Sequence, residues 1–123
     1  MSLKIAVEQS KAPTIVLIGR LDTNTAPQLD ETLNKVLARQ GLKQLVFDLS
    51  QLEYLSSAGI RCFVRARKAI EPTGGKVAIV NPQPGVQKVL DIVKAIPKGG
   101  VFTSIAELDE YLDEMQRQVR DKE

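Results

Sequence analysis

The sequence predicts an α/β fold, with a mixed, mainly parallel sheet of four to five strands, an antiparallel N-terminal strand and about four helices. Short β-branched runs such as TIVLIG and KVAIV alternate with longer segments whose apolar residues recur at helical spacing. Such alternation implies parallel strands joined by right-handed crossovers. A length of 123 residues with 43% hydrophobic residues is enough for one domain with a single core.

The first two strands are predicted to form an antiparallel hairpin. In LKIAVEQ, residues 3–9, apolar and polar residues alternate, which is typical of a half-buried edge strand. A turn at residues 11–13 leads to TIVLIG, residues 14–19, whose unbroken apolar character indicates burial on both faces. Because the two runs are joined tightly, we expect them to pair with each other.

The middle of the chain reads as helix, strand, helix. Residues 26–41 carry apolar side chains at helical spacing and end at Gly41, a common helix stop. The run KQLVFDLS, residues 43–50, is predicted to be a central strand covered on both faces. The next helix begins at Ser57 and ends before Pro72, which disfavours helix in the residue that precedes it.

The C-terminal part is predicted to add a buried strand, a helix, a short strand and a last helix. The strand is KVAIV, residues 76–80, and the helix covers residues 81–96. The short strand is VF, residues 101–102, and the last helix covers residues 104–119. Its inward face is predicted to consist of Ile105, Leu108, Leu112 and Met115.

Composition excludes several classes of function. The net charge is +2 and basic residues are interspersed with acidic ones, so we expect no nucleic-acid partner. The apolar runs are far shorter than the ~20 residues of a membrane span, and no signal-peptide pattern opens the chain. We therefore expect no membrane insertion and a cytoplasmic protein, with one domain over residues 1–118 and a frayed tail over 119–123. The lone Cys62 agrees with a reducing compartment.

No catalytic residue, cofactor or metal site is predicted. The chain has no histidine, which removes serine–histidine triads and histidine-based zinc sites. The glycines of TGGKVAIV lead into a strand, whereas a phosphate-binding loop needs Gly-Lys-Ser/Thr at the start of a helix. The carboxylates are spread over different elements. We therefore expect no enzymatic activity.

Two serines mark the start of the second helix. In FDLSQLEYLSSAGIR, Phe47–Arg61, Ser56 and Ser57 precede Ala58 and Gly59. Serine in this place commonly caps free backbone N–H groups. The same helix end also favours negative charge, so phosphorylation, which adds about −1.5 to −2 charges, would be tolerated there. The small residues that follow are expected to leave the hydroxyl open to approach, and both interpretations remain open.

A basic stripe follows the serines along the same helix. It consists of Arg61, Arg65 and Lys68, spaced so that they share one face. A solvated helix face accounts for most such stripes. Arg61 begins one turn after the serine pair, so it could also reach back toward an anion bound there.

The serine segment resembles the signature of the STAS domain, the family of bacterial anti-sigma factor antagonists and of the cytoplasmic tails of sulfate transporters. GRLDTNTAPQL, Gly19–Leu29, resembles a second landmark of the family, a Gly-x-Leu-Asp turn before a helix start. The later segment GGKVAIVNPQPGVQKVLDI fits the same order. The likeness covers nearly the whole chain and implies a STAS-like fold.

The resemblance also singles out residues. In the antagonists, the serine directly after an aspartate is phosphorylated by a partner kinase that is also the anti-sigma factor, and Ser57 takes that position. Ser56 replaces the family aspartate, and Ala58 replaces a second Ser/Thr. Asp22 matches the aspartate of the other landmark, which in the family shares a surface with the phosphoserine. The expected partner-binding residues are Asp22, Thr23, Asn24, Thr25, Ser56, Ser57, Ala58, Gly59 and Arg61.

The implied function is that of an anti-sigma factor antagonist in a partner-switching module. The unphosphorylated protein would bind a serine kinase/anti-sigma factor, and phosphorylation of Ser57 would release it. A serine phosphatase is the further partner that would complete such a switch. The substitutions at Ser56 and Ala58 motivate an alternative, a STAS scaffold or binding subunit of a larger regulatory or transporter complex that is not phosphorylated. A monomer or weak dimer is expected in either case.

Overall fold

The computed structural model describes residues 2–9, 12–95 and 105–122, and the predicted mixed sheet is confirmed in them. The sheet has strand order β1-β2-β3-β4, with β1 antiparallel to β2 and the other pairs parallel. The elements are β1 (Leu3–Glu8), β2 (Thr14–Leu21), α1 (Ala26–Leu37), β3 (Gln44–Leu55), α2 (Ser57–Ile70), the short 3-10 helix η1 (Glu71–Thr73), β4 (Lys76–Val80), α3 (Pro84–Ala95) and α4 (Ile105–Lys122).

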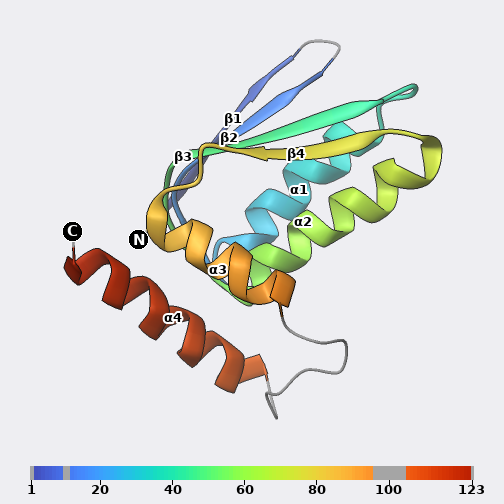
Figure 1. The fold of residues 1–123 in the computed structure, drawn as a ribbon. Coiled ribbons are helices and arrows are strands. Elements are labelled where there is room, and N and C mark those ends of the chain that lie inside the picture. Colours follow the sequence, from blue (N-terminus) through green and yellow to red (C-terminus); the bar gives the residue numbers. More distant parts are fainter. Residues whose placement is uncertain (1, 10–11, 96–104, 123) are drawn as a thin grey trace.

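The helices cover one face of this sheet. α1 and α2 lie side by side against it, and α4 lies against α3 (Figure 1). Side chains that point toward these helices are fully buried, as Ile15 and Phe47 are. Those on the opposite face, such as Val16 and Val46, stay partly exposed. The expectation that β2 and β3 are covered on both faces is therefore wrong, because an unbroken apolar run does not show how many layers a sheet has.

β4 is the edge strand of the sheet and is half-buried along most of its length, not fully buried as expected. It pairs with β3 from Gln44 only as far as Asp48. β3 itself is 12 residues long and continues to Leu55, well past the predicted end at residue 50. The helix therefore follows the strand with one residue, Ser56, between them, and the far half of β3 extends beyond β4.

The last helix differs in part from its predicted inward face. Leu112 is fully buried and Met115 is half-buried, while the side chains of Ile105 and Leu108 lie outside the described residues. Gln116 is also buried, which the sequence pattern did not indicate. The predicted short strand at residues 101–102 lies outside the described residues. α4 continues to Lys122, past residue 118, and the division into domain and tail stays a prediction.

Candidate functional site

The two family-like landmarks meet at one end of the sheet. Leu21, the last residue of β2, pairs with Leu55, the last residue of β3. The Ser56 N–H donates to the Leu21 carbonyl at 3.0 Å. Because parallel strands end at the same edge, the turn after β2 and the start of α2 come together there.

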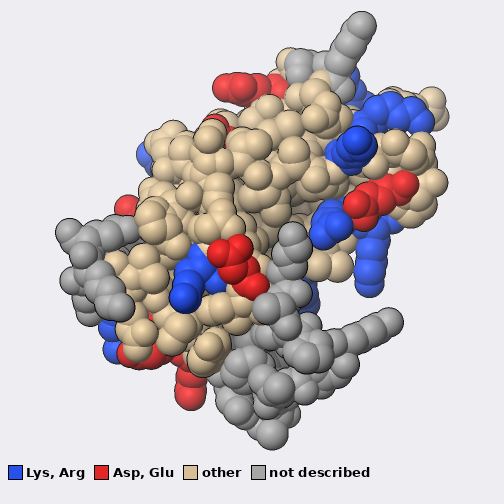
Figure 2. Space-filling view, viewed as in Figure 1, with Lys and Arg blue, Asp and Glu red and all other residues tan. Residues whose placement is uncertain are grey.

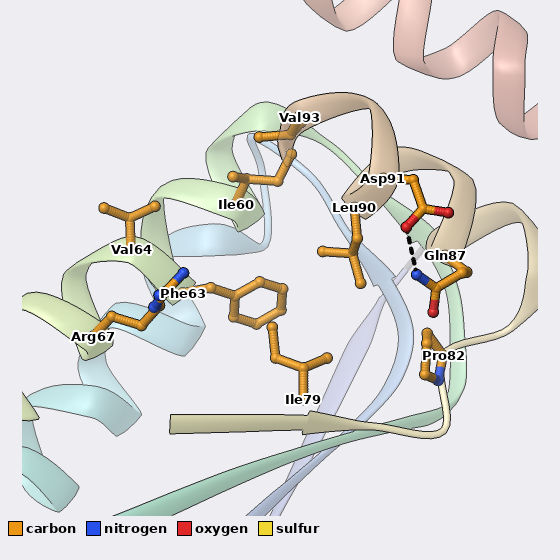
Figure 3. A pocket seen from close by; sticks show the side chains of 10 residues that line it. All are labelled: Ile60, Phe63, Val64, Arg67, Ile79, Pro82, Gln87, Leu90, Asp91 and Val93. Atoms are coloured by element: carbon orange, nitrogen blue, oxygen red, sulfur yellow. Dashed lines mark hydrogen bonds between the residues drawn. The ribbon is translucent and has the colours of Figure 1, made fainter. Parts of the chain in front are cut away.

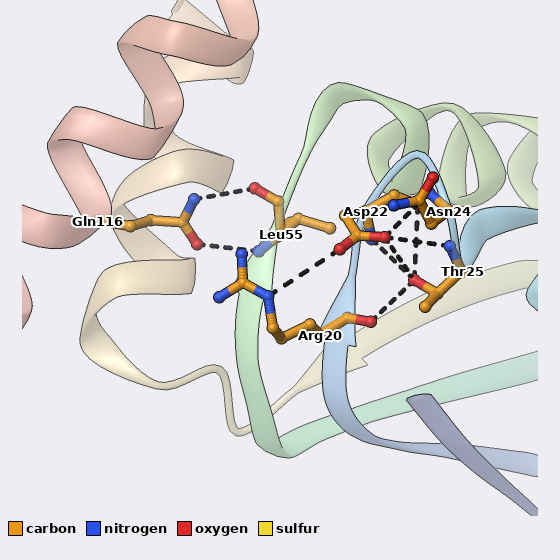
Figure 4. A network of polar contacts seen from close by, with 6 residues as sticks. All are labelled: Arg20, Asp22, Asn24, Thr25, Leu55 and Gln116. Carbon is orange, nitrogen blue, oxygen red and sulfur yellow. Dashed lines mark hydrogen bonds and ion pairs between the residues drawn. The ribbon is translucent and has the colours of Figure 1, made fainter. Parts of the chain in front are cut away.

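The turn after β2 is held by Asp22. Its Oδ1 accepts from the backbone N–H groups of Asn24 and Thr25, each at 3.0 Å. The Thr25 hydroxyl in turn donates to the Arg20 carbonyl at 2.8 Å and accepts from the Asp22 N–H at 2.9 Å (Figure 4). This carboxylate therefore shapes its own turn, and the two side chains of the turn that remain exposed are those of Thr23 and Asn24.

The serines at the start of α2 are covered. Ser56 is 3% exposed and Ser57 is 7% exposed, and within the described part of the chain neither hydroxyl has a hydrogen-bond partner. Ser56 is the N-cap residue but makes no side-chain cap bond. Both the capping role and the open approach to the hydroxyl are therefore wrong for this conformation.

Gly59 explains the close packing under the serines. A Cβ built on Gly59 would lie 2.6 Å from Leu21 Cγ and 2.6 Å from Leu55 Cδ1. Both leucines are fully buried. The small residue thus lets the first turn of α2 lie directly on the ends of β2 and β3, whereas the sequence suggested an open path to the serine.

α4 provides the polar groups that meet this junction. The Asp109 Oδ1 accepts from the Ser57 N–H at 2.9 Å. The Gln116 Oε1 accepts from the Leu55 N–H at 2.9 Å, and its Nε2 donates to the Leu55 carbonyl at 3.0 Å (Figure 4). Gln116 is 2% exposed. A carboxylate thus stands at the amide of Ser57 although position 56 lacks the family aspartate.

The length of β3 explains why a glutamine is needed. Beyond Asp48, β3 has no pairing with β4, so the free N–H and C=O of Leu55 require other partners. A glutamine amide can donate and accept at once and so satisfies both groups. The signal available in the sequence was only that Gln116 follows Leu112 by four residues, on the same helix face.

Arg20 and Tyr54 connect the two landmarks. The Arg20 guanidinium lies 4.0 Å from the centre of the Tyr54 ring, and its Nε is 3.9 Å from Asp22 Oδ2. Burial raises the pKa of Tyr54 above its ordinary value, and the nearby Asp113 carboxylate raises it further. The acidic groups Asp109 and Asp113 of α4 therefore border the junction, as does Arg20.

One member of the basic stripe of α2, Arg65, is engaged with α1. Arg65 bonds Asp30 Oδ1 at 3.1 Å and also bonds Asn34, so it ties α2 to α1. Arg61 is exposed, and its reach toward an anion stays a prediction. In the view of Figure 2, basic and acidic side chains lie next to each other.

A groove of about 540 Å³ lies between α2, β4 and α3. Phe63, Ile79 and Leu90 are among the apolar side chains that line it (Figure 3). Among the described residues that line it, the Asp91 carboxylate accepts from Gln87 at 2.8 Å. Across the described residues there is no cluster able to hold a metal ion and no helix long and apolar enough to cross a membrane.

The Cys62 thiol should be inert in the folded protein. It is 3% exposed, and burial, followed by the adjacent Asp30 carboxylate, raises its pKa to about 12. Because folding raises the pKa of this thiol, the thiol contributes to the free energy of unfolding. The contribution is fully present below the unfolded pKa of about 8.5 and is lost as the pH rises toward 12. Between pH 8 and pH 10, urea unfolding should show wild type losing about 2 kcal/mol more stability than Cys62→Ala. Equal losses would contradict this burial.

Comparison with known proteins identifies relatives of most of this chain. The model of the STAS domain matches residues 4–108. An anti-sigma F factor antagonist of Paenibacillus polymyxa is 28% identical over 93 residues, which cover 75% of this chain and 80% of that protein. The predicted likeness to this family is thereby confirmed.

Solved structures show the same fold. An anti-sigma factor antagonist from Mycobacterium paratuberculosis superposes with a TM-score of 0.66 at 22% identity, covering 97% of this chain and 95% of that one. The Bacillus cell fate determinant SpoIIAA in its phosphorylated form gives a TM-score of 0.58 at 18% identity, covering 75% and 83%. At these identities the likeness concerns the fold alone.

Proposed function

The chain belongs to the STAS domain family, and on this premise we propose that it acts as an anti-sigma factor antagonist in a partner-switching module. The unphosphorylated protein binds a serine kinase that is also the anti-sigma factor. The kinase transfers the γ-phosphoryl group of ATP to Ser57 Oγ, the hydroxyl proton is lost and ADP leaves. The observation that carries the proposal is the position of Ser57, the first residue of α2 beside the turn after β2.

The start of α2 can accommodate an anion. Backbone N–H groups at a helix start have no partner in the helix, and the helix dipole favours negative charge there by about 0.3–1 kcal/mol. The Ser57 N–H already donates to the Asp109 carboxylate. A phosphate carried by Ser57 would compete for this same place, which supports Ser57 as the residue that switches.

The partner surface is proposed to centre on the two landmarks. Thr23 and Asn24 are exposed at the turn after β2, and Arg61 is exposed on α2. Asp22 and Thr25 shape that turn from inside. Ser56, Ser57 and Ala58 are buried at the start of α2, where Gly59 packs on Leu21 and Leu55. A cytoplasmic location, a monomeric or weakly dimeric state and a reversing serine phosphatase are parts of this same proposal.

Phosphate mapping tests the proposal. The full chain is incubated with ATP and the serine kinase encoded nearest to its own gene, then digested with trypsin. Cleavage after Lys43 and Arg61 gives a peptide of residues 44–61 that contains Ser50, Ser56 and Ser57. Fragmentation should place the phosphate on Ser57, and Ser57→Ala should remain unmodified. An active kinase that modifies another residue, or none, would disprove the switch.

The burial of the serines favours one alternative, a constitutive binding subunit of a larger complex. Neither hydroxyl is accessible in this conformation, and a binding module needs no access to them. In that case the protein purified from its native cells would carry no phosphoserine under any growth condition.

A further inference from the structure

Helix α4 lies over the segment Leu55–Ser57, here called the β3–α2 junction. We propose that α4 is a removable cover, and that it must leave the β3–α2 junction before Ser57 can be phosphorylated. The consequence for phosphorylation rests on the proposed function. The opening of α4 itself does not, because it is a property of this chain alone.

The first argument is access. The hydroxyl oxygens of Ser56 and Ser57 each expose less than 1 Å². A kinase must bring the phosphorus of ATP into line with the serine oxygen, so it cannot act on a hydroxyl that even water does not reach. The junction must therefore open, and α4 is the element that approaches it from outside the sheet (Figure 4).

The second argument is how α4 is held. Of the described side chains of α4, residues 109–119, the buried ones are Leu112 and Gln116, whereas Tyr111 is 40% exposed. Gln116 holds the Leu55 backbone and Asp109 holds the Ser57 N–H. Water can replace such polar contacts when a helix detaches, so the net cost of each bond is modest. Within residues 109–119, the bonds that hold α4 to the β3–α2 junction itself are thus polar ones, while α4 also packs against α3.

The third argument is charge. Asp109 bonds the amide of Ser57, and Asp113 lies near Tyr54, at the end of β3. A phosphate on Ser57 would stand beside the Asp109 carboxylate and would be repelled by it. Once the serine is modified, α4 cannot return to the same place. The cover would therefore close only over the unmodified serine.

Thiol labelling measures the opening without a kinase. The variant Ser57→Cys places a thiol at the junction, and the native Cys62 serves as a reporter of unfolding of the α1–α2 core. Iodoacetamide labelling of both thiols is followed by mass spectrometry in the full chain. Added to this background, Gln116→Ala should speed labelling of the introduced thiol on the order of tenfold, because two bonds to Leu55 are lost. Asp109→Ala should speed it severalfold.

Matched substitutions on the same helix provide the controls. Glu110→Ala removes the same charge as Asp109→Ala from an exposed position, and Gln118→Ala removes an exposed amide. Neither should change the labelling of the introduced thiol, and Cys62 should remain slow throughout. Equal rates in all variants, or rates that rise in parallel at both thiols, would overturn the cover. Phosphate mapping can give a negative result whatever the labelling shows. The opening of α4 and the phosphorylation of Ser57 are therefore tested separately.

Discussion

Ser57→Asp should detach α4 from the β3–α2 junction. The substitution places a negative charge where the serine oxygen exposes less than 1 Å², beside the Asp109 carboxylate. An uncompensated buried charge costs about 3–5 kcal/mol. This cost exceeds the net stabilisation from the hydrogen bonds that Asp109 and Gln116 make to the junction. The chain should therefore keep its sheet and release α4.

Hydrogen exchange of the backbone amides of Leu55 and Ser57 measures the release of α4. The N–H groups of Leu55 and Ser57 are bonded to α4 side chains, so they are protected only while α4 is in place. In Ser57→Asp, their exchange should accelerate by more than about a hundredfold, while amides in the centre of β3 keep their protection. Unchanged exchange at residues 55 and 57 would contradict the arrangement described for α4.

Two uncharged variants separate charge from size. Ser57→Asn has the bulk of aspartate without its charge and should release α4 much less. Ser57→Ala removes a buried hydroxyl that has no partner, so stability should stay equal or rise by up to about 1 kcal/mol. A loss of about 1 kcal/mol on removal of the Ser57 hydroxyl would instead indicate that this hydroxyl makes a stabilising hydrogen bond. Urea unfolding of Ser57→Ala therefore tests the unpartnered, buried state of the hydroxyl.

The family resemblance was sufficient to predict which segments meet at the site. In the structure, β2 and β3 are parallel and end at one edge, which brings the turn of Asp22 near Ser57. The resemblance was not sufficient to predict α4 above them. Gln116 became visible only with the fold, because its partner is the backbone of Leu55, 61 residues away. A buried amide of this kind has no periodic signal of its own.

The length of β3 was missed for a related reason. Residues 50–55 include Ser50, Gln51 and Glu53, which are exposed and do not look like a central strand. They remain in the sheet because β2 pairs with them as far as Leu55. This extension also places the start of α2 directly after Leu55, where the Ser57 N–H meets Asp109 of α4. Local residue type therefore indicated the helix start correctly and the accessibility of its hydroxyls wrongly, while the switch role of Ser57 stays a prediction.

Gly19→Ala should be among the most destabilising single changes at the landmark turn. Gly19 has φ +110°, which side-chain-bearing residues rarely adopt, and a Cβ there would lie 2.4 Å from the Ser2 carbonyl oxygen. Backbone strain costs about 1–3 kcal/mol and the steric overlap a similar amount. We expect the free energy of unfolding in urea to fall by about 2–4 kcal/mol.

Gly41→Ala is the matched control, because Gly41 also has positive φ, +73°, but open space around it. It should cost about 1–2 kcal/mol from conformation alone. The additional destabilisation at Gly19 should also disturb the candidate site. The pairing of β2 with β3 is irregular between Gly19 and Arg20, and this irregularity sets Arg20 opposite Tyr54. Gly19→Ala should therefore also speed exchange of the Leu55 amide, whereas Gly41→Ala should not. Equal losses of stability in the two variants would show that the Ser2 contact yields freely and that the landmark glycine is required only for its φ.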